Sequence, residues 1–212
     1  MDFKIPNCVN IIEPQILSFG NKEAIKEIWE NLYKISDPKI KEFHNYEFYD
    51  KIIEWLADDK GLGLGIYRSE GDGLINNGSG KSIFINKVYP ILLYNVYNRT
   101  PILINSIDIK SMEQLENKIF KFTNREILII DEFSREPLVI NEYGTIYKPM
   151  ERIIDHCERF GWKLIFATNY TKKEIVAHYN SNHLTDRIRS LTYSIECSGK
   201  SSRKSTNKIY DR

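Results

Sequence analysis

The feature that most constrains the fold of this chain is a run of four apolar residues, Ile127–Ile130, which Asp131 and Glu132 follow directly. A strand without polar alternation is typical of a strand buried on both faces, as in parallel sheets that helices cover on both sides. Further short apolar runs alternate with helical patterns along the chain, at 61–66, 102–104, 163–167 and 192–197. The sequence therefore predicts an α/β fold, a three-layer α/β/α sandwich around a central parallel sheet.

Helical periodicity, with apolar residues three and four positions apart, separates these runs. It predicts helices over about 21–36, 46–57, 81–97, 111–122, 148–160, 171–179 and 184–190. Pro38 ends the first helix, and Pro90 is expected to kink the third helix or to end its first part, because proline cannot donate the helical hydrogen bond. The first two helices form an N-terminal element, residues 1–58, which is too small to be stable without something to pack on.

Composition excludes several classes of protein. The chain has 212 residues, with 30 Lys and Arg against 29 Asp and Glu, and its formal charge of +1 excludes a histone-like basic protein. No stretch approaches the roughly 18 apolar residues of a membrane span, and the opening residues do not form a signal peptide. Three cysteines lie far apart, and four histidines show no metal-ligand spacing. We therefore expect a reduced, cytoplasmic protein that does not contact a membrane.

A glycine-rich segment, NNGSGKS at residues 76–82, precedes the third predicted helix. Glycines let backbone N–H groups turn inward and a helix start favours an anion, so such a loop is typical of phosphate binding. In this pattern Lys81 reaches the terminal phosphates and the Ser82 hydroxyl binds Mg²⁺. The sequence has Ile75 where the full pattern places its first glycine, and a surface turn that happens to precede Lys81 is the alternative. The predicted nucleotide-binding residues here are Asn77, Gly78, Ser79, Gly80, Lys81, Ser82 and Ile83.

Asp131 and Glu132 follow a buried strand at the edge where ligands bind in open α/β sheets. Asp131 is predicted to hold Mg²⁺ through water, and Glu132 to orient and activate the attacking water. A strand that ends in two acids is often only a solvated strand end. With the glycine-rich loop upstream, the pair indicates a nucleotide site.

Two further signals follow the next strand. Asn169, with Thr168 beside it, is predicted to contact the γ-phosphate or the attacking water, although Asn169 or Thr171 is equally suited to cap the next helix. Arg187 and Arg189 are candidates for the arginine that stabilises charge in phosphoryl transfer. Because they are two residues apart on a helix, they point to different faces, and at most one of them has this role. Solvated helix charges are the alternative.

Together these residues resemble the AAA+ ATPases of the ASCE group of P-loop NTPases, and within them the DnaC-type replicative helicase loaders. The general markers are GSGKS at 78–82, IIDE at 129–132 and ATN at 167–169. More particular are Glu136-Pro137, Tyr143-Gly144, a helix that ends in Tyr179, LTDRI at 184–188 and SGKSSR at 198–203. The resemblance covers about residues 60–203, so an AAA+ core is expected over 59–203, with a basic tail over 204–212.

The resemblance implies ATP and Mg²⁺ as cofactors and a role for each marker. It implies Walker A Gly78, Gly80, Lys81 and Ser82, Walker B Asp131 and Glu132, sensor-1 Asn169, a finger acting in trans at Arg187, and Arg203 as the analogue of the sensor-2 arginine. It also implies a core without a C-terminal helical lid. The implied partners are a replicative helicase, single-stranded DNA and further copies of this chain, which associate through the ATP site. The N-terminal helices would grip the helicase.

Three other functions are compared with that of a helicase loader. An IstB-type transposition helper shares this core and differs in its partner, which is a transposase. A nucleotide-gated adaptor with little hydrolysis is suggested by Ile75 in place of glycine. A small-molecule kinase is disfavoured, because the adjacent Asp131 and Glu132 suit the activation of water.

Overall fold

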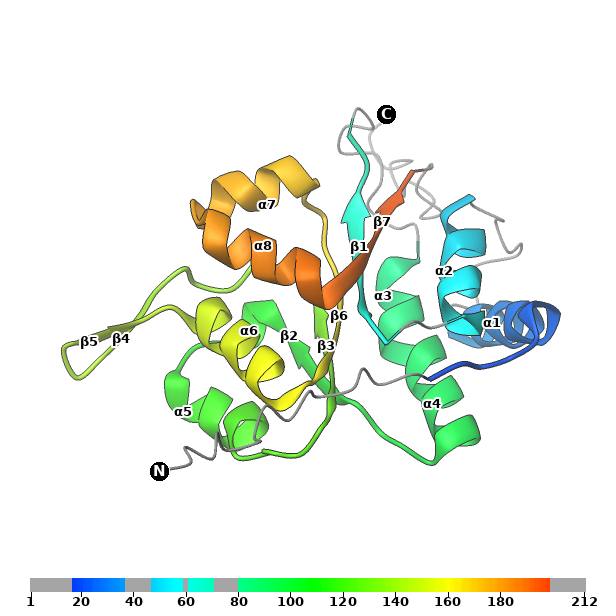
Figure 1. Cartoon of the computed structure of the whole chain (residues 1–212), viewed down its shortest axis with the longest axis horizontal. Coiled ribbons are helices and arrows are strands. Elements are labelled where there is room, and N and C mark those ends of the chain that lie inside the picture. The colour runs from blue at the N-terminus through cyan, green and yellow to red at the C-terminus, as the bar shows by residue number, and fades with distance from the viewer. Residues whose placement is uncertain (1–16, 37–46, 59–60, 71–79, 199–212) are drawn as a thin grey trace, which may run out of the picture.

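The computed structural model describes residues 17–36, 47–58, 61–70 and 80–198. At its centre lies a parallel sheet of five strands in the order β2-β3-β6-β1-β7 (Figure 1). The strands are β1 (Gly63–Arg68), β2 (Ile102–Asn105), β3 (Ile127–Asp131), β6 (Lys163–Ala167) and β7 (Thr192–Cys197). The predicted fold class, α/β with a central parallel sheet, is confirmed.

The parallel strands place the ends of β3 and β6 side by side at one edge of the sheet. β6 lies between β1 and β3, with Ile165 opposite both Leu64 of β1 and Ile129 of β3. Because all five strands are parallel, Asp131 at the end of β3 and the residues after β6 lie at the same edge. This edge is where an open α/β sheet binds its ligands.

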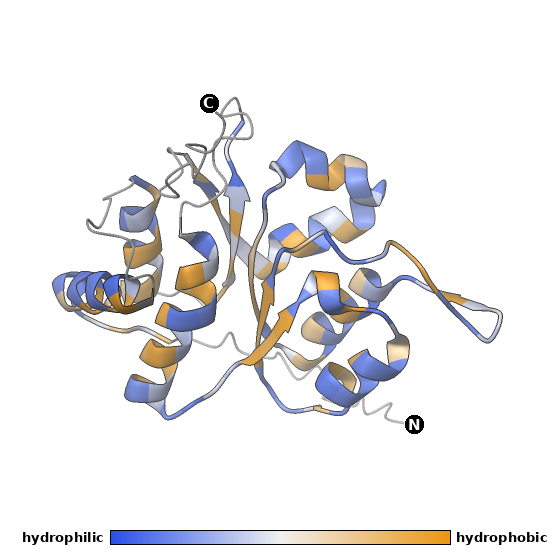
Figure 2. Ribbon diagram, turned by 180° about the vertical axis from the view of Figure 1, so that it is seen from behind, coloured by the Kyte–Doolittle hydropathy of each residue, from blue (hydrophilic) through white to orange (hydrophobic). Residues whose placement is uncertain are grey.

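Two hydrophobic cores, one on each face of the sheet, explain the unbroken apolar run. Ile127 and Ile129 belong to one core, whereas Leu128 and Ile130 belong to the other. All four are at most 1% exposed. Figure 2 shows that the central strands are mostly hydrophobic, whereas the helices mix hydrophobic and hydrophilic residues around their circumference. Helices that bury one side on each face of the sheet produce this pattern.

One face is covered by helices that come before β2 in the chain. They are α1 (Lys22–Ser36), α2 (Glu47–Ala57), α3 (Lys81–Ile83), the π-helical η2 (Phe84–Val88) and α4 (Tyr89–Tyr97). The Trp29 ring of α1 packs 4.3 Å from that of Tyr49 in α2 and 4.7 Å from that of Phe84 in η2. The N-terminal helices therefore share a hydrophobic core with the sheet.

Pro90 coincides with a change in the pitch of the third predicted helix. The chain forms the wider π-helical turn over Phe84–Val88, and Pro90 then occupies the first turn of α4. Because η2 leads directly into α4, Pro90 lies inside a continuous helical run, where its missing N–H removes one helical hydrogen bond. The wide turn lets the helix continue to Tyr97 past the proline.

The other face is covered by helices from the second half of the chain (Figure 1). They are α5 (Met112–Leu115), the π-helical η4 (Glu116–Phe120), α6 (Pro149–Phe160), α7 (Lys172–Tyr179) and α8 (Asn182–Leu191). A short 3₁₀ turn, η3 (Ser106–Asp108), follows β2. In the parts of the chain that the structure describes, no helix is long and apolar enough to cross a membrane.

The structure also contains a small hairpin that the sequence did not predict. Its strands, β4 (Ile140–Glu142) and β5 (Thr145–Tyr147), pair antiparallel and extend away from the sandwich (Figure 1). Tyr143 and Gly144 connect them with φ of 53° and 83°. Positive φ at both central residues is the signature of the two-residue turn that favours hairpins. Strands of three residues are too short for a periodic pattern, which is why they were missed.

β1 begins and ends two residues later than the predicted strand at 61–66. It spans Gly63–Arg68, and its glycines permit close packing against β6. A Cβ on Gly65 would lie only 2.7 Å from the Phe166 ring. The alternative strand at Leu74 and Ile75 lies outside the described residues.

Candidate nucleotide site

The structure describes the glycine-rich loop only from its last glycine onward. Gly80 has φ of 87° and caps the helix that starts at Lys81. Asn77, Gly78 and Ser79 lie outside the described residues, as do Ile75 and Arg203. Ile83, also predicted to bind nucleotide, is half-buried and packs against the hydrophobic core. Backbone N–H groups at the helix start have no intrahelical acceptor and are suited to bind phosphate.

Lys81 is a buried cation beside the two acids of β3. Its side chain is 6% exposed. Burial lowers the pKa of the ammonium, while the charges of Cys197, Glu132 and Asp131 act in the opposite direction. A buried lysine that gains phosphate oxygens as partners recovers the solvation that burial removed, so anion binding favours the charged form.

Asp131 is held through both carboxylate oxygens. Oδ1 accepts hydrogen bonds from the Ser82 hydroxyl at 3.0 Å and from the Glu132 backbone N–H at 2.9 Å. Oδ2 accepts a hydrogen bond from the Asn86 side-chain amide at 2.7 Å. Mg²⁺ prefers oxygen ligands and is usually held by one or two carboxylates plus phosphates and water. The paired oxygens of Ser82 and Asp131 fit such an ion.

Asn86 was missed by the sequence analysis, because no phosphate-loop pattern places a functional residue at that position. It lies on η2, one helical turn after Ser82, which brings both side chains to Asp131. The Asn86 amide is the group on that turn that holds Oδ2, the second carboxylate oxygen of Asp131.

Replacing Asn86 with alanine is expected to raise the Mg²⁺ concentration for half-maximal ATP binding by roughly tenfold, because a released carboxylate is less well oriented for the metal. Titration of Mg²⁺ at fixed fluorescent ATP analogue measures this. Asn95→Ala, an exposed asparagine on α4, is the matched control. Identical Mg²⁺ curves for Asn86→Ala and the control would remove Asn86 from this role.

Glu132 has a strained backbone conformation, with φ of 52°. Positive φ is uncommon for a residue with a side chain and costs of order 1–3 kcal/mol, so surrounding contacts must impose it. The Ser106 hydroxyl at the end of β2 donates to the Glu132 carbonyl. The Phe133 carbonyl accepts from the Thr168 hydroxyl at 2.8 Å, and the Phe133 N–H donates to Ala167 at 3.0 Å. Contacts from β2 and β6 thus fix the position of Glu132.

Asn169 contacts Glu132 and does not cap the next helix. Its side-chain amide donates to Glu132 Oε2 at 3.3 Å. The cap of α7 is Thr171, which forms a reciprocal capping box with Glu174. Since these contacts assign the cap to Thr171, the side chain of Asn169 remains next to the carboxylate.

Arg187, by contrast, is engaged by α6. Its guanidinium pairs with Glu158 at 2.6 Å and with Asp155, and its side chain is 18% exposed. Arg189 lies on another face of α8, is 61% exposed and forms a 3.3 Å ion pair with Asp186 of the same helix. The two arginines therefore differ in their freedom to reach a neighbouring subunit.

The N-terminal helices contact the described end of the glycine-rich loop. A Cβ on Gly80 would lie 2.6 Å from the Tyr33 ring of α1 and 2.7 Å from the Tyr49 hydroxyl of α2. Both tyrosines are 1% exposed. Neither was singled out from the sequence, since aromatic residues at helical spacing are typical of a core.

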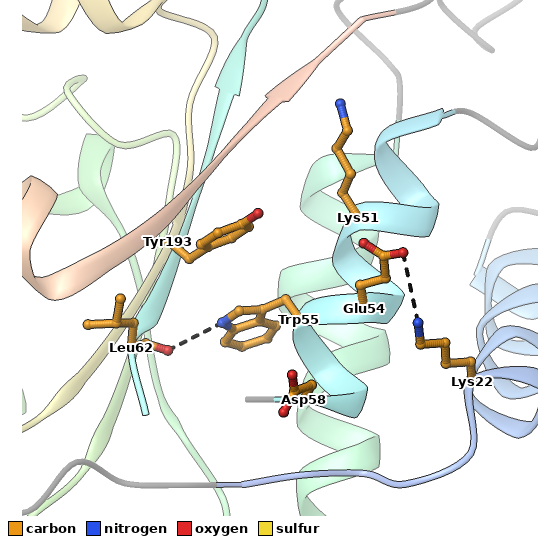
Figure 3. A pocket seen from close by; sticks show the side chains of 7 residues that line it. All are labelled: Lys22, Lys51, Glu54, Trp55, Asp58, Leu62 and Tyr193. Atoms are coloured by element: carbon orange, nitrogen blue, oxygen red, sulfur yellow. Dashed lines mark hydrogen bonds and ion pairs between the residues drawn. The ribbon is translucent and has the colours of Figure 1, made fainter. Parts of the chain in front are cut away.

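A cavity of about 290 Å³ lies elsewhere, between α1, α2 and the sheet (Figure 3). Leu62, which lines it, precedes β1 and so lies at the edge opposite to Asp131. Trp55 in its wall is 6% exposed and donates to the Leu62 carbonyl, and the Lys163 ammonium lies 5.3 Å from its ring. This ring is thus a packing element, and the cavity is separate from the candidate nucleotide site.

Comparisons with solved structures yield matches of low identity. A candidate primosome component from Streptococcus pyogenes serotype M3 is 14% identical, with a TM-score of 0.49 over 91% of this chain and 87% of that chain. DnaI is 17% identical, with a TM-score of 0.49 over 73% of this chain and 87% of that chain. A point mutant of Thermotoga maritima RuvB is 12% identical, with a TM-score of 0.41 over 88% of this chain and 50% of that chain.

A scan against protein-family models gives no match, and a search of curated proteins gives none either. The strand order and the position of the acids at the end of β3 are observed in this structure and do not depend on the comparisons. The chain has an α/β fold with a central parallel sheet of five strands. The function is therefore argued from the residues of the site.

The structure brings five of the predicted residues to one edge of the sheet. They are Lys81, Ser82, Asp131, Glu132 and Asn169. In the described ranges no group of three or more His, Cys, Asp and Glu residues is placed to hold a metal ion. A metal here would depend on Ser82, Asp131 and the oxygens of a bound nucleotide.

Proposed function

We propose that this chain is an ATP-binding and ATP-hydrolysing protein of the DnaC-like type, which couples its Mg–ATP state to binding of a replicative helicase and single-stranded DNA. The observation that carries the proposal is the contact of Asn169 with Glu132, beside Asp131 and Ser82. A carboxylate held in a strained turn and oriented by an amide is suited to activate water.

In the proposed reaction, the helix start and Lys81 bind the terminal phosphates. Glu132 accepts a proton from a water whose oxygen attacks the γ-phosphorus, while the bond from that phosphorus to the bridging oxygen breaks and ADP leaves. Asn169 orients the Glu132 carboxylate. Bound Mg²⁺, held by Ser82 and Asp131, would neutralise charge on the phosphates.

The N-terminal element, residues 1–58, is proposed to bind the partner protein. The close packing of Tyr33 and Tyr49 on Gly80 supports this, because a change in the loop on ATP binding would press on α1 and α2. Co-purification in the presence of ATP tests the partner. Capture of a hexameric helicase supports the proposal, whereas capture of a transposase supports the IstB-type alternative.

An adaptor with little hydrolysis makes a different prediction. In that case Lys81→Ala abolishes partner binding, while Glu132→Gln changes nothing measurable. The contacts that hold Glu132 in an unfavourable backbone conformation favour hydrolysis, because an adaptor has no use for an oriented carboxylate.

Arg187 is proposed to act on the ATP site of a neighbouring subunit. To do so it must leave Asp155 and Glu158, or bring them into the interface. Mixing Lys81→Ala with Arg187→Ala subunits is expected to restore part of the ATPase activity that each preparation lacks, because sites with an intact lysine then face an intact arginine. The parallel mixture with Arg189→Ala is the control. Recovery only in the Arg189 mixture would transfer the role to Arg189.

A further inference from the structure

Three buried polar residues and the partly buried Tyr179 form a cluster around the turn that carries Glu132, and the reaction outlined above uses none of them. They are Ser106, Ser134, Glu136 and Tyr179. Ser106 and Ser134 are 0% exposed and Glu136 is 4% exposed. Buried polar groups cost stability unless they are hydrogen-bonded, so a cluster of this size requires an explanation.

The cluster is joined by short hydrogen bonds between distant parts of the chain. The Tyr179 hydroxyl, at the end of α7, donates to Glu136 Oε1 at 2.6 Å. The same hydroxyl accepts from the Ser134 hydroxyl at 3.1 Å. Glu136 Oε2 is buried and has no hydrogen-bond partner among the described residues. Burial raises the pKa of Glu136 and also that of Tyr179, so the tyrosine keeps the proton that it donates.

The cluster closes a strained turn, Glu132–Glu136, which we call the Glu132 turn. Glu132 and Ser134 have φ of 52° and 72°. The Arg135 N–H donates to the Glu132 carbonyl at 3.1 Å and to the Ser106 hydroxyl at 3.2 Å. Two residues with positive φ in three positions persist only where contacts impose them. Tyr179 supplies the contact to Ser134 and Glu136 from α7.

We propose that Tyr179 and Glu136 are positioning residues, which hold the Glu132 turn closed and thereby set the orientation of Glu132 for hydrolysis. The proposal rests on the proposed function and deepens it. It makes the position of α7 a determinant of the rate of hydrolysis, separately from ATP binding.

The segment just before α7 and the last residue of α7 both contact the Glu132 turn. Asn169, two residues before the cap of α7, contacts the Glu132 carboxylate, and Tyr179, the last residue of α7, contacts Glu136. α7 also packs against α8, which carries Arg187 and Arg189. A displacement of α8 by a neighbouring subunit therefore has a direct mechanical route to the catalytic carboxylate, through Tyr179 and Glu136.

The test begins with Tyr179→Phe, which removes one hydroxyl and keeps the ring. The change removes the two hydrogen bonds that this hydroxyl makes, to Glu136 and from Ser134. We expect kcat for ATP hydrolysis to fall about 3- to 10-fold, with the Kd for ATP unchanged. Tyr97→Phe is the matched control. It removes a hydroxyl from a tyrosine in α4, and this hydroxyl donates to the Ser18 carbonyl. In a Glu132→Gln background the residual turnover should not fall further, because the residue being positioned is gone.

Glu136 gives an independent comparison. Glu136→Gln keeps an oxygen acceptor for Tyr179 and should retain most of the turnover, whereas Glu136→Ala should lose at least as much as Tyr179→Phe. Hydrogen exchange at the Phe133 and Arg135 amides should accelerate in Tyr179→Phe and stay unchanged in Tyr97→Phe.

Unchanged kcat in Tyr179→Phe, or an equal loss in the Glu132→Gln background, would overturn the proposal. If the wild-type chain hydrolyses no ATP, the proposed function fails. Hydrogen exchange alone then tests whether Tyr179 holds the Glu132 turn closed. Accelerated exchange then supports the structural part, and unchanged exchange contradicts it.

Discussion

Lys81→Ala is expected to weaken ATP binding by roughly 10- to 100-fold, since it removes a charge-assisted contact to the terminal phosphates. Lys81 is 6% exposed and lies beside the two acids at the end of β3, where its ammonium is held close to the proposed phosphate site. Titration calorimetry with ATP and Mg²⁺ measures the loss. Lys87→Ala, which removes an exposed lysine from the same helical segment, is the control and should bind normally.

The lowered pKa of Lys81 adds a pH dependence to this prediction. ATP binding requires the ammonium, which is lost as pH rises through its pKa. Since burial holds that pKa below the ordinary lysine value, affinity should decline at a less alkaline pH than an exposed lysine would give. Lys81→Ala should lack this alkaline decline. A decline of the same size in Lys81→Ala would assign it to another group.

Glu132→Gln is expected to reduce turnover by about 10²-fold or more, because the amide cannot accept the proton of the attacking water. ATP should remain bound, since Lys81, Ser82 and Asp131 are unchanged. Single-turnover hydrolysis and nucleotide retention, measured on the same sample, separate the two effects. Glu113→Gln, an exposed acid on α5, is the matched control. Turnover near the wild-type rate in Glu132→Gln would remove Glu132 from its assigned role.

The sheet was predictable because its strands carry their own signal. Ile127–Ile130 and Lys163–Ala167 are buried on both faces, and only apolar runs satisfy that environment. The order of the strands was not predictable in this way, since it depends on which strand each crossover helix returns to. The placement of β6 between β1 and β3 is therefore a finding of the structure.

The site was predictable where a residue type follows a strand or starts a helix. Lys81, Asp131 and Asn169 were identified in that way, and the structure brings them to one edge. Asn86 was not identified, and Tyr179 was noted only as the end of a helix and was given no role, because their partners lie 45 and 43 residues away in sequence. Contacts of that kind depend on tertiary packing and leave no local pattern.

Arg187 shows the limit of a resemblance. The motif LTDRI places an arginine at this position, but the acids that it contacts, Asp155 and Glu158, lie on α6 some thirty positions earlier. Arg187 thus connects α8 to α6 within one chain. Its role toward a second chain stays a prediction, which the mixing experiment tests.

The most direct test of the central claim is steady-state ATP hydrolysis by the wild-type chain with Mg²⁺, with and without single-stranded DNA, and with Glu132→Gln as the reference. We expect turnover that DNA stimulates and that Glu132→Gln abolishes. Tight ATP binding without turnover under any of these conditions would contradict the claim that this chain is an ATPase responsive to DNA.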